Sequence, residues 1–412
     1  MRVLIVNRSD MLGGAAIASH RLMRALRRQG VDARMLVIDR RDIDPYAQAM
    51  GNEFKNKWNF LAERLGIYMH NGFNRETLFK IDTATRGYDL CKHPWIAETD
   101  IVVLNWINQG TLSLNTVWDL ADMGKHIVWT MHDMWNCTGV CHHAYDCRKY
   151  EQTCMACPLL GTKGNDLSTR TQKRKKKLYA NVPISFVAVS NWLADCCRRS
   201  SLMAGSNLQV IANPFPTDDY GFDRYRDEEL DIPADKTVVA MGAARLDDPV
   251  KGFDRFIAMT HYIADSKPAL ASKLHFMLYG GIKDESLLED IALPFTYLGF
   301  VDSYEVNNVY RQADIVLSTS LHESFGYTLV EGMASGCVPV TTGDGGQVDI
   351  VEHLKNGYVA SSTEPAELAK GLEWAACCHI ERGELHAYVA ENFDSSIIAD
   401  KYMALFSSLL AE

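Results

Sequence analysis

Two glutamates stand eight residues apart in a stretch that is otherwise almost uncharged. The stretch reads LHESFGYTLVEGMASGCVPVTTGDGG from Leu321 to Gly346, and the two glutamates are Glu323 and Glu331. Small and apolar residues surround both, which is the composition of a buried strand, a turn and a helix. A carboxylate in such a setting needs hydrogen-bond donors or a cation nearby. We therefore regard both as candidate ligand-binding residues.

The flanking segments place these carboxylates at one edge of a sheet. The run ADIVLSTS predicts a buried strand, LHESFG is then the loop at its carboxyl end, and YTLVEGMASG predicts a helix that ends at Gly336. The amides around Gly326 and Tyr327 would begin this helix, where unsatisfied N–H groups and the helix dipole favour an anion. A phosphate flanked by two carboxylates suits a ligand that carries both phosphates and hydroxyls, such as a sugar nucleotide.

Strand-like and helical segments alternate along the whole chain. The strand-like runs are RVLIV, DARMLVID, DIVVLNW, HIVWTMHD, ISFVAVS and LQVIANP, followed by a second series, TVVAMGAAR, LHFMLYGG, FTYLGFV, ADIVLSTS and CVPVTTG. Such alternation predicts parallel sheets, and the two series predict two doubly wound α/β domains separated near IANPFPTDD. Ligands of such sheets bind at the carboxyl ends of the strands, so we expect the site in a cleft between the domains.

Composition and charge narrow the class of protein. The chain has 412 residues, of which 47% are hydrophobic and 23% charged, as in soluble globular proteins with room for two domains. Without a long apolar run or a signal sequence at its N-terminus, it is expected to be cytoplasmic. The formal net charge of -10 argues against nucleic acid as a partner. One basic run, RTQKRKKKLYA at residues 170–180, is either a solvated helix face or a patch for anionic lipid at the inner membrane face.

Taken in order, the motifs resemble those of the retaining glycosyltransferases with the GT-B fold, specifically glycosyltransferase family 4 (glycosyl transferases group 1). The resemblance is carried by the pair of glutamates followed by GCVPVTT, and by GGAAIASHRL, WTMHD, VAVSNWL, VIANPF, GAARLDDPVKGFD, YLGFV, GGQVDIVEHLKNGYV and FDSSIIADKYMALF. It covers nearly the whole chain. It implies an acceptor-side Rossmann-like domain at residues 1–212, a nucleotide-sugar-binding domain at 213–394 that faces it across a cleft, and a C-terminal helix at 395–412 that returns to the first domain.

The resemblance also implies roles toward a nucleotide diphosphate sugar, with UDP or GDP as the nucleotide. Arg245 and Lys251 would hold the diphosphate and stabilise the departing nucleotide; a surface salt bridge is the alternative for each. Glu331 would accept hydrogen bonds from the ribose hydroxyls. Glu323 would lie near the donor sugar, unless it only caps the following helix. His132 would contact the donor sugar, unless it is a satisfied core histidine.

Glycine and loop residues complete the predicted donor site. Gly13 and Gly14 would permit a close backbone approach to donor or acceptor, or would form an ordinary strand–helix turn. The other predicted donor-binding residues are Gly299, Phe300 and Val301, which would bracket the base, and Phe325, Gly326, Tyr327 and Thr328 at the helix N-terminus.

The reaction implied by the resemblance is transfer of a sugar to an acceptor hydroxyl with retained anomeric configuration. The acceptor would be a glycan or a lipid-linked glycan, in the synthesis of a surface polysaccharide or another glycan. The alternative is a nucleotide-sugar epimerase, or another GT-B enzyme that acts on the donor without an acceptor. No catalytic metal is expected, because the one Asp-x-Asp sequence, at Asp42 and Asp44, lies in a polar stretch typical of a solvent loop.

A cysteine-rich segment follows His132. Its cysteines are Cys137, Cys141, Cys147, Cys154 and Cys157. Because cytosolic thiols stay reduced, such clustering favours a metal. The last four could hold a structural zinc ion, with His142 or His143 replacing one ligand and the first cysteine left over. Disulfides and free buried thiols are the alternatives, and the segment would shape a loop on the acceptor side.

Overall fold

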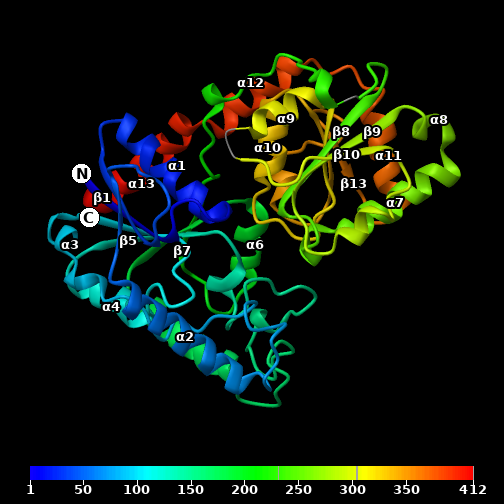
Figure 1. Ribbon diagram of the computed structural model, residues 1–412. Coiled ribbons are helices and arrows are strands. Elements are labelled where there is room, and N and C mark those ends of the chain that lie inside the picture. Colours follow the sequence, from blue (N-terminus) through cyan, green and yellow to red (C-terminus); the bar gives the residue numbers. More distant parts are fainter. Residues whose placement is uncertain (231, 303–304, 412) are drawn as a thin grey trace. The chain divides into compact units, whose positions relative to one another are not determined.

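Two all-parallel sheets organise the chain, each in its own compact unit (Figure 1). The structure, a computed structural model, describes residues 1–230, 232–302 and 305–411. Unit 1 consists of Met1–Pro214 together with Ser395–Glu412, and unit 2 of Phe215–Asp394. The predicted last helix ran to residue 412, which lies outside the described residues.

The sheet of unit 1 has seven strands in the order β3-β2-β1-β4-β5-β6-β7. Their bounds are β1 Arg2–Ser9, β2 Asp32–Asp39, β3 Ala47–Ala49, β4 Ile101–Leu104, β5 His126–Met131, β6 Ile184–Ala188 and β7 Asn207–Val210. The chain reverses its direction of winding between β1 and β4, which are hydrogen-bonded neighbours. The carboxyl ends of these two strands are therefore the topological switch point, where ligands bind in folds of this kind.

Helices cover the sheet of unit 1. They are α1 Gly14–Arg28, α2 Glu53–His70, α3 Pro94–Glu98, α4 Leu114–Asp122, α5 Leu167–Asn181, α6 Asn191–Arg199 and, from the C-terminus, α13 Ser395–Ala411. Leu22, Met23 and Leu26 of α1 share one hydrophobic core with Ile398 and Phe406 of α13. The predicted return of the C-terminal helix to the first domain is thereby confirmed.

Unit 2 repeats the arrangement with six strands in the order β10-β9-β8-β11-β12-β13. The strands are β8 Thr237–Arg245, β9 Leu274–Gly281, β10 Phe295–Tyr297, β11 Ile315–Ser318, β12 Val338–Thr342 and β13 Tyr358–Ala360. The helices are α7 Phe253–Ser266, α8 Pro268–Ala271, α9 Val306–Gln312, α10 Tyr327–Ala334, α11 Pro365–Ala375 and α12 Arg382–Phe393. Its switch point lies between β8 and β11, which pair through Ile315 and Val316.

The predicted fold class, α/β with two doubly wound sheets, is confirmed. All eleven predicted strand-like runs overlap a strand of the structure, and DARMLVID, TVVAMGAAR and LHFMLYGG coincide with β2, β8 and β9. The strands β3 and β13 were not predicted. Both are three residues long and lie at or near a sheet edge, where the hydrophobic pattern is weak. Among the described residues, no helix is long and apolar enough to cross a bilayer.

Candidate functional site

The loops after β8 and β11 lie side by side at the switch point of unit 2. Two hydrogen bonds join them: Leu321 N donates to Val250 O at 2.8 Å, and the Thr319 side chain donates through Oγ1 to Lys251 O at 2.9 Å. Gly252 has a φ of 68°, and a Cβ there would lie 2.1 Å from Thr319 O. Only glycine tolerates this conformation and this contact together. The sequence therefore fixes the loop that carries Lys251 against the loop that carries Glu323.

Lys251 and Glu323 form an ion pair within this assembly. Lys251 Nζ donates to Glu323 Oε1 at 2.6 Å, and the side chains are 32% and 17% exposed. Burial lowers the pKa of Lys251, but attraction to Glu323 and their hydrogen bond outweigh burial and leave the pKa raised. The lysine is therefore charged at neutral pH. The arrangement presents one cation and one carboxylate, both partly open to solvent, at the edge where β8 and β11 end.

Arg245 ends β8 beside this pair. Its Nε lies 3.1 Å from Asp247 Oδ1, and one terminal nitrogen lies 3.5 Å from Asp248 Oδ2. The guanidinium is partly exposed, and Asp247 also accepts a hydrogen bond from Lys283 N at 3.1 Å. The two aspartates were not predicted as part of the site, although they follow Arg245 directly in ARLDDPVK. They hold the arginine at the strand end and neutralise part of its charge.

The start of α10 lies in the same loop region. Its N-cap is Gly326, with a φ of 110° and no side chain to cap the first turn. The loop before it is braced by the segment that follows β12, since Gly346 N donates to Glu323 O at 2.6 Å. Phe325 is buried with its ring 5.1 Å from that of Tyr327, measured between centroids. The predicted binding residues at this helix start, including Thr328, are thus held together at the switch point.

Glu331 lies within α10, half-buried rather than on an open helix surface. Two tyrosines share its surroundings, Tyr279 at the end of β9 and Tyr310 in α9, whose hydroxyl oxygens are 2.5 Å apart. Burial and the charge of Glu331 raise the pKa of Tyr279, and burial with Tyr279 and Glu331 raises that of Tyr310. The ring of Tyr279 packs on Gly242 of β8, where a Cβ would lie 2.0 Å from Tyr279 Cζ. Neither tyrosine was predicted from the sequence as part of the site.

The loop after β10 holds the residues predicted to bracket the base. Gly299 has a φ of 68°, and its carbonyl oxygen accepts a hydrogen bond from Gly280 N at 2.7 Å. This bond ties the loop to the end of β9. The side chain of Phe300 is exposed and Val301 is half-buried. The loop therefore offers backbone groups and one exposed aromatic ring at this edge of the unit 2 sheet.

The corresponding edge of unit 1 carries Gly13, Gly14 and His132. Both glycines are exposed in the β1–α1 connection, and Gly13, the N-cap of α1, has a φ of 86°. His132 follows β5, and its Nε2 lies 2.9 Å from Oδ1 of Asn105, which follows β4. Burial lowers the pKa of His132 to about 4, against a smaller opposing effect of Asp133. The imidazole is neutral at neutral pH and, with the amide oxygen as acceptor, carries its proton on Nε2.

A buried chain of charged groups extends from Asp133. Asp133 Oδ2 accepts hydrogen bonds from Trp106 Nε1 at 2.9 Å and His142 Nδ1 at 2.7 Å, and His142 Nε2 lies 2.8 Å from Asp82 Oδ2. Asp82 also pairs with Arg64 of α2. Burial would lower the pKa of His142, but the two aspartates raise it to about 10. His142 was predicted as a possible metal ligand. In the structure, both of its ring nitrogens instead lie within hydrogen-bond distance of carboxylates, those of Asp133 and Asp82.

The cysteine-rich segment packs around this chain of charges. All five predicted cysteines are free thiols, and Gly139 N donates to Cys154 Sγ at 3.2 Å. Burial raises the pKa values of Cys141, Cys154 and Cys157, and Cys147 is close enough to affect the latter two. No group of three or more His, Cys, Asp or Glu side chains in the described part of the chain is arranged to hold a metal ion. The zinc site stays a prediction.

The basic run at residues 170–180 lies in α5. Arg170, Lys173 and Lys177 are exposed on this helix. Lys175 is fully buried: its ammonium lies 3.3 Å from the centroid of the Trp135 ring and donates to backbone carbonyls. Burial lowers its pKa to about 7, opposed by the neighbouring cysteines. The prediction of a solvated face is therefore wrong at Lys175, which anchors the helix to the cysteine-rich segment.

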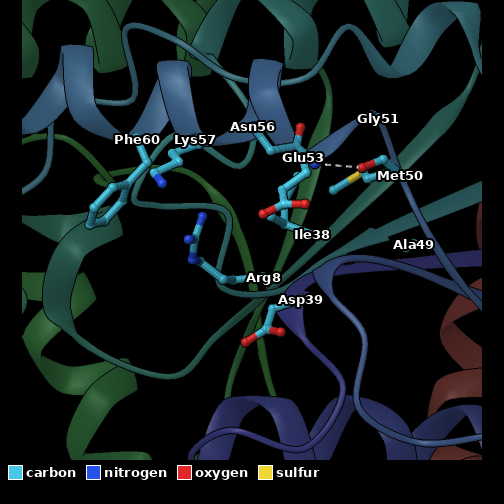
Figure 2. Close-up of a pocket in the computed structure, with 10 residues that line it drawn as sticks. All are labelled: Arg8, Ile38, Asp39, Ala49, Met50, Gly51, Glu53, Asn56, Lys57 and Phe60. Carbon is cyan, nitrogen blue, oxygen red and sulfur yellow. Dashed lines mark hydrogen bonds between the residues drawn. The ribbon is translucent and has the colours of Figure 1, made fainter.

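A cavity of about 380 Å³ opens at the carboxyl ends of β1, β2 and β3 in unit 1. It is lined by Arg8, Ile38, Asp39, Ala49, Met50, Gly51, Glu53, Asn56, Lys57 and Phe60. Figure 2 shows the Arg8 guanidinium pointing from the strand end toward Lys57 and Glu53 of α2. Arg8 donates to Gln109 O at 2.8 Å, which fixes its direction. This cavity was not predicted from the sequence, in which its one local signal is the charged Arg8 at the end of an apolar strand.

Comparison with known proteins adds three findings. Residues 225–392 match the family model described as glycosyl transferases group 1. A D-inositol 3-phosphate glycosyltransferase from Saccharomonospora viridis is 29% identical over 154 residues, which is 35% of each chain. The stretches aligned with three curated relatives span only 20%, 31% and 35% of the relatives' own lengths.

Solved structures match over the whole chain. Sucrose-phosphate synthase from Thermosynechococcus elongatus has a TM-score of 0.69 with 16% identity, covering 100% of this chain and 99% of that one. The Anabaena protein HepE, in complex with UDP and glucose, has a TM-score of 0.64 with 16% identity, covering 99% of this chain and 100% of that one. At such identities the likeness shows the fold alone.

Proposed function

Because the chain has the GT-B fold and its second unit carries a glycosyl transferases group 1 domain, we propose that it transfers a sugar from a nucleotide diphosphate sugar to an acceptor hydroxyl. One observation carries the proposal. Arg245, Lys251, Glu323 and the start of α10 converge on the carboxyl ends of β8 and β11, the switch point of unit 2. This edge joins fixed cations and a helix N-terminus with carboxylates, a combination suited to a diphosphate attached to a sugar.

Each group has a distinct part in the proposed donor site. Arg245 and Lys251 hold the diphosphate and stabilise the negative charge that builds up on it as the sugar leaves. The amides at the start of α10 add to this stabilisation. Glu331 accepts hydrogen bonds from the ribose hydroxyls. Glu323 contacts the donor sugar. It also forms the ion pair with Lys251, which holds the lysine side chain in position.

His132 supplies hydrogen bonds rather than charge. With a pKa of about 4 it is neutral at neutral pH. We assign it to hydroxyls of the donor sugar, and we assign Gly13 and Gly14 to a close backbone approach at the same edge of unit 1. The cavity beside α2 is assigned to the acceptor, since Arg8 and Lys57 among its lining residues suit the phosphate of a lipid-linked acceptor.

The proposed reaction exchanges one bond at the anomeric carbon for another. The bond from this carbon to the β-phosphate oxygen breaks with both electrons leaving on the phosphate. The acceptor oxygen forms the new bond from the same face, and its proton passes to the departing phosphate.

The anomeric configuration of the product, measured by NMR, tests whether the configuration is retained, and an inverted product would overturn the proposal. Activity that a chelator abolishes and manganese restores would contradict the proposed metal-free chemistry.

The donor is tested first by thermal shift with UDP, GDP, ADP and their sugar conjugates. A ligand that binds the folded state raises its apparent melting temperature. We expect a selective shift with UDP or GDP and their sugars, and UDP is the first candidate because the HepE structure contains it. Absence of any shift at saturating ligand would remove the proposed donor site. Conversion of the donor without an acceptor would indicate an epimerase instead.

A surface polysaccharide or another glycan is the proposed product, built on a glycan or lipid-linked acceptor. The exposed residues Arg170, Lys173 and Lys177 of α5 support contact with anionic headgroups at the inner membrane face. Incorporation of radiolabelled sugar into an organic-solvent extract of membranes tests the lipid-linked acceptor. Label found only in water-soluble glycan would contradict it.

A further inference from the structure

Helix α2 presents an apolar stripe to solvent. The exposed fractions are 82% for Phe54, 59% for Trp58, 49% for Leu61, 56% for Leu65 and 53% for Met69. Their spacing of three or four residues places them on one face along the 18 residues of the helix. Large apolar side chains that occur singly at a surface need no explanation, but a continuous row of five marks an interaction surface.

The opposite face of α2 is buried and carries Asn59, Glu63 and Arg64 beside a single core residue, Ile67, so it is more polar than the buried face of an ordinary surface helix. Glu63 and Arg64 have side-chain exposures of 0% and 5%. Glu63 accepts hydrogen bonds from Thr83 N at 3.1 Å and Gly110 N at 2.7 Å, and Arg64 donates to Leu78 O at 2.7 Å. These contacts fix the rotation of the helix about its axis. Because Glu63 and Arg64 must face inward to make these contacts, the apolar row on the opposite face points to solvent.

The apolar surface continues into the loop that follows α2. Phe73 and Phe79 are exposed there, and Phe79 stacks on Phe60 of the helix at 6.4 Å between ring centroids. Tyr68 and Phe73 also contact each other edge to face. We call the five exposed residues of α2, together with Phe73 and Phe79, the α2 apolar surface.

The charges around the α2 apolar surface are mainly positive. Lys55 and Lys57 are exposed on α2, whose acidic residues are Glu53 in the first turn and the buried Glu63. In the loop that carries Phe73 and Phe79, the exposed charged residues are Arg75, Glu76 and Lys80. Apolar and aromatic side chains bordered by lysine are the composition of helices that lie in the interface of an anionic membrane.

We propose that the α2 apolar surface inserts into the interface of an anionic phospholipid bilayer and holds the protein on the membrane. The aromatic and leucine side chains enter the boundary between headgroups and acyl chains, while Lys55 contacts lipid phosphates. This surface is separate from the basic run of α5, which lacks exposed apolar residues of this kind in its helix. The inference does not depend on the transferase assignment, because it rests on exposure, helix rotation and charge alone.

Vesicle co-sedimentation of the full chain tests the proposal. The wild-type protein should bind vesicles of equal parts phosphatidylglycerol and phosphatidylcholine more tightly than pure phosphatidylcholine vesicles, and added salt should weaken the binding. The double variant Leu61→Gln, Leu65→Gln should bind roughly a hundredfold more weakly, since each leucine contributes about one factor of ten when buried. Ile43→Gln, an exposed apolar position elsewhere in unit 1, is the matched control and should bind as the wild type does.

A second measurement needs no destabilising change. Brominated lipids should quench the fluorescence of the wild-type protein more than that of Trp58→Phe, because Trp58 lies in the row of side chains that enters the bilayer. Equal quenching in both proteins would overturn the proposal, as would vesicle binding that the double leucine variant retains. Sedimentation velocity without lipid tests the alternative that a second copy of the chain, rather than a bilayer, covers the α2 apolar surface. A dimer that the double variant dissociates would assign the surface to self-association and also overturn the proposal.

Discussion

Replacing Lys251 by methionine tests whether the Lys251–Glu323 ion pair only stabilises the two loops or also binds the donor. An exposed ion pair contributes about 0–1 kcal/mol, whereas removing one partner of a buried pair costs about 3–5 kcal/mol. With the two side chains 32% and 17% exposed, the pair falls between these limits. We expect Lys251→Met to cost about 2 kcal/mol, and the melting temperature of a unit of this size to fall by roughly 4–8 °C.

The expected loss of activity is larger than the loss of stability. A fixed cation that stabilises a departing diphosphate is worth about 3–4 kcal/mol in the transition state, so kcat/KM should fall by about 100-fold to 1000-fold. Glu323→Gln should cost less stability, because the lysine left behind reaches solvent. The double variant should regain part of the lost stability, since neither charge is left alone.

Activity of the double variant decides between the readings. If the pair only positions the loops, the double variant should recover activity along with stability. If Lys251 and Glu323 contact the donor, activity stays low although stability recovers, and recovery of activity would refute our reasoning. Lys267→Met is the matched control, because Lys267 Nζ lies at the same distance of 2.6 Å from Glu373 in the same unit, away from the carboxyl ends of the strands. It should leave kcat/KM unchanged, measured by nucleotide release.

Three further predictions follow from the same geometry. Gly252→Ala should destabilise the protein by about 1–3 kcal/mol in urea unfolding, because of its left-handed φ and the 2.1 Å approach of Thr319 O; an unchanged midpoint would contradict the contact. Asp82→Asn should cost about 3–5 kcal/mol, since Arg64 loses its buried partner; a loss under about 1 kcal/mol would show that the charge is solvated. His132 has a folded pKa near 4, below that of the unfolded chain, so it contributes stability at neutral pH that is lost as pH falls from about 6.5 to 4. His132→Gln should remove that part of the pH dependence, and an unaltered profile would assign it to other groups.

Much of the fold follows from local pattern. The strand and helix runs predicted for the chain appear at their expected places because alternating apolar runs and helical periodicity are properties of neighbouring residues. The same holds for the loop that carries Glu323 and for the helix start at Gly326. The edge strands β3 and β13 were not predicted, because three residues are too few to show the alternation of apolar and polar residues that marks a strand.

Contacts between distant residues were decided by the tertiary structure. Lys251 meets Glu323 across 72 residues, and His142 meets Asp82 across 60. No local pattern specifies such a partner, because the partner is set by which strand ends become neighbours in the sheet. Sequence reasoning could therefore identify both Lys251 and Glu323 as ligand-binding candidates without pairing them.

The sequence by itself determined that two parallel α/β units exist and that chemistry-bearing residues stand at the ends of their strands. Only the tertiary structure decided which residues are buried. Lys175 lies in a basic run yet is fully enclosed, and Leu61 and Leu65 lie in an apolar pattern yet face solvent. The physical reason is that helical periodicity defines two faces but not which face is inward. In α2 that choice follows from the buried hydrogen bonds and ion pair of Glu63 and Arg64, whose partners come from other segments of the chain.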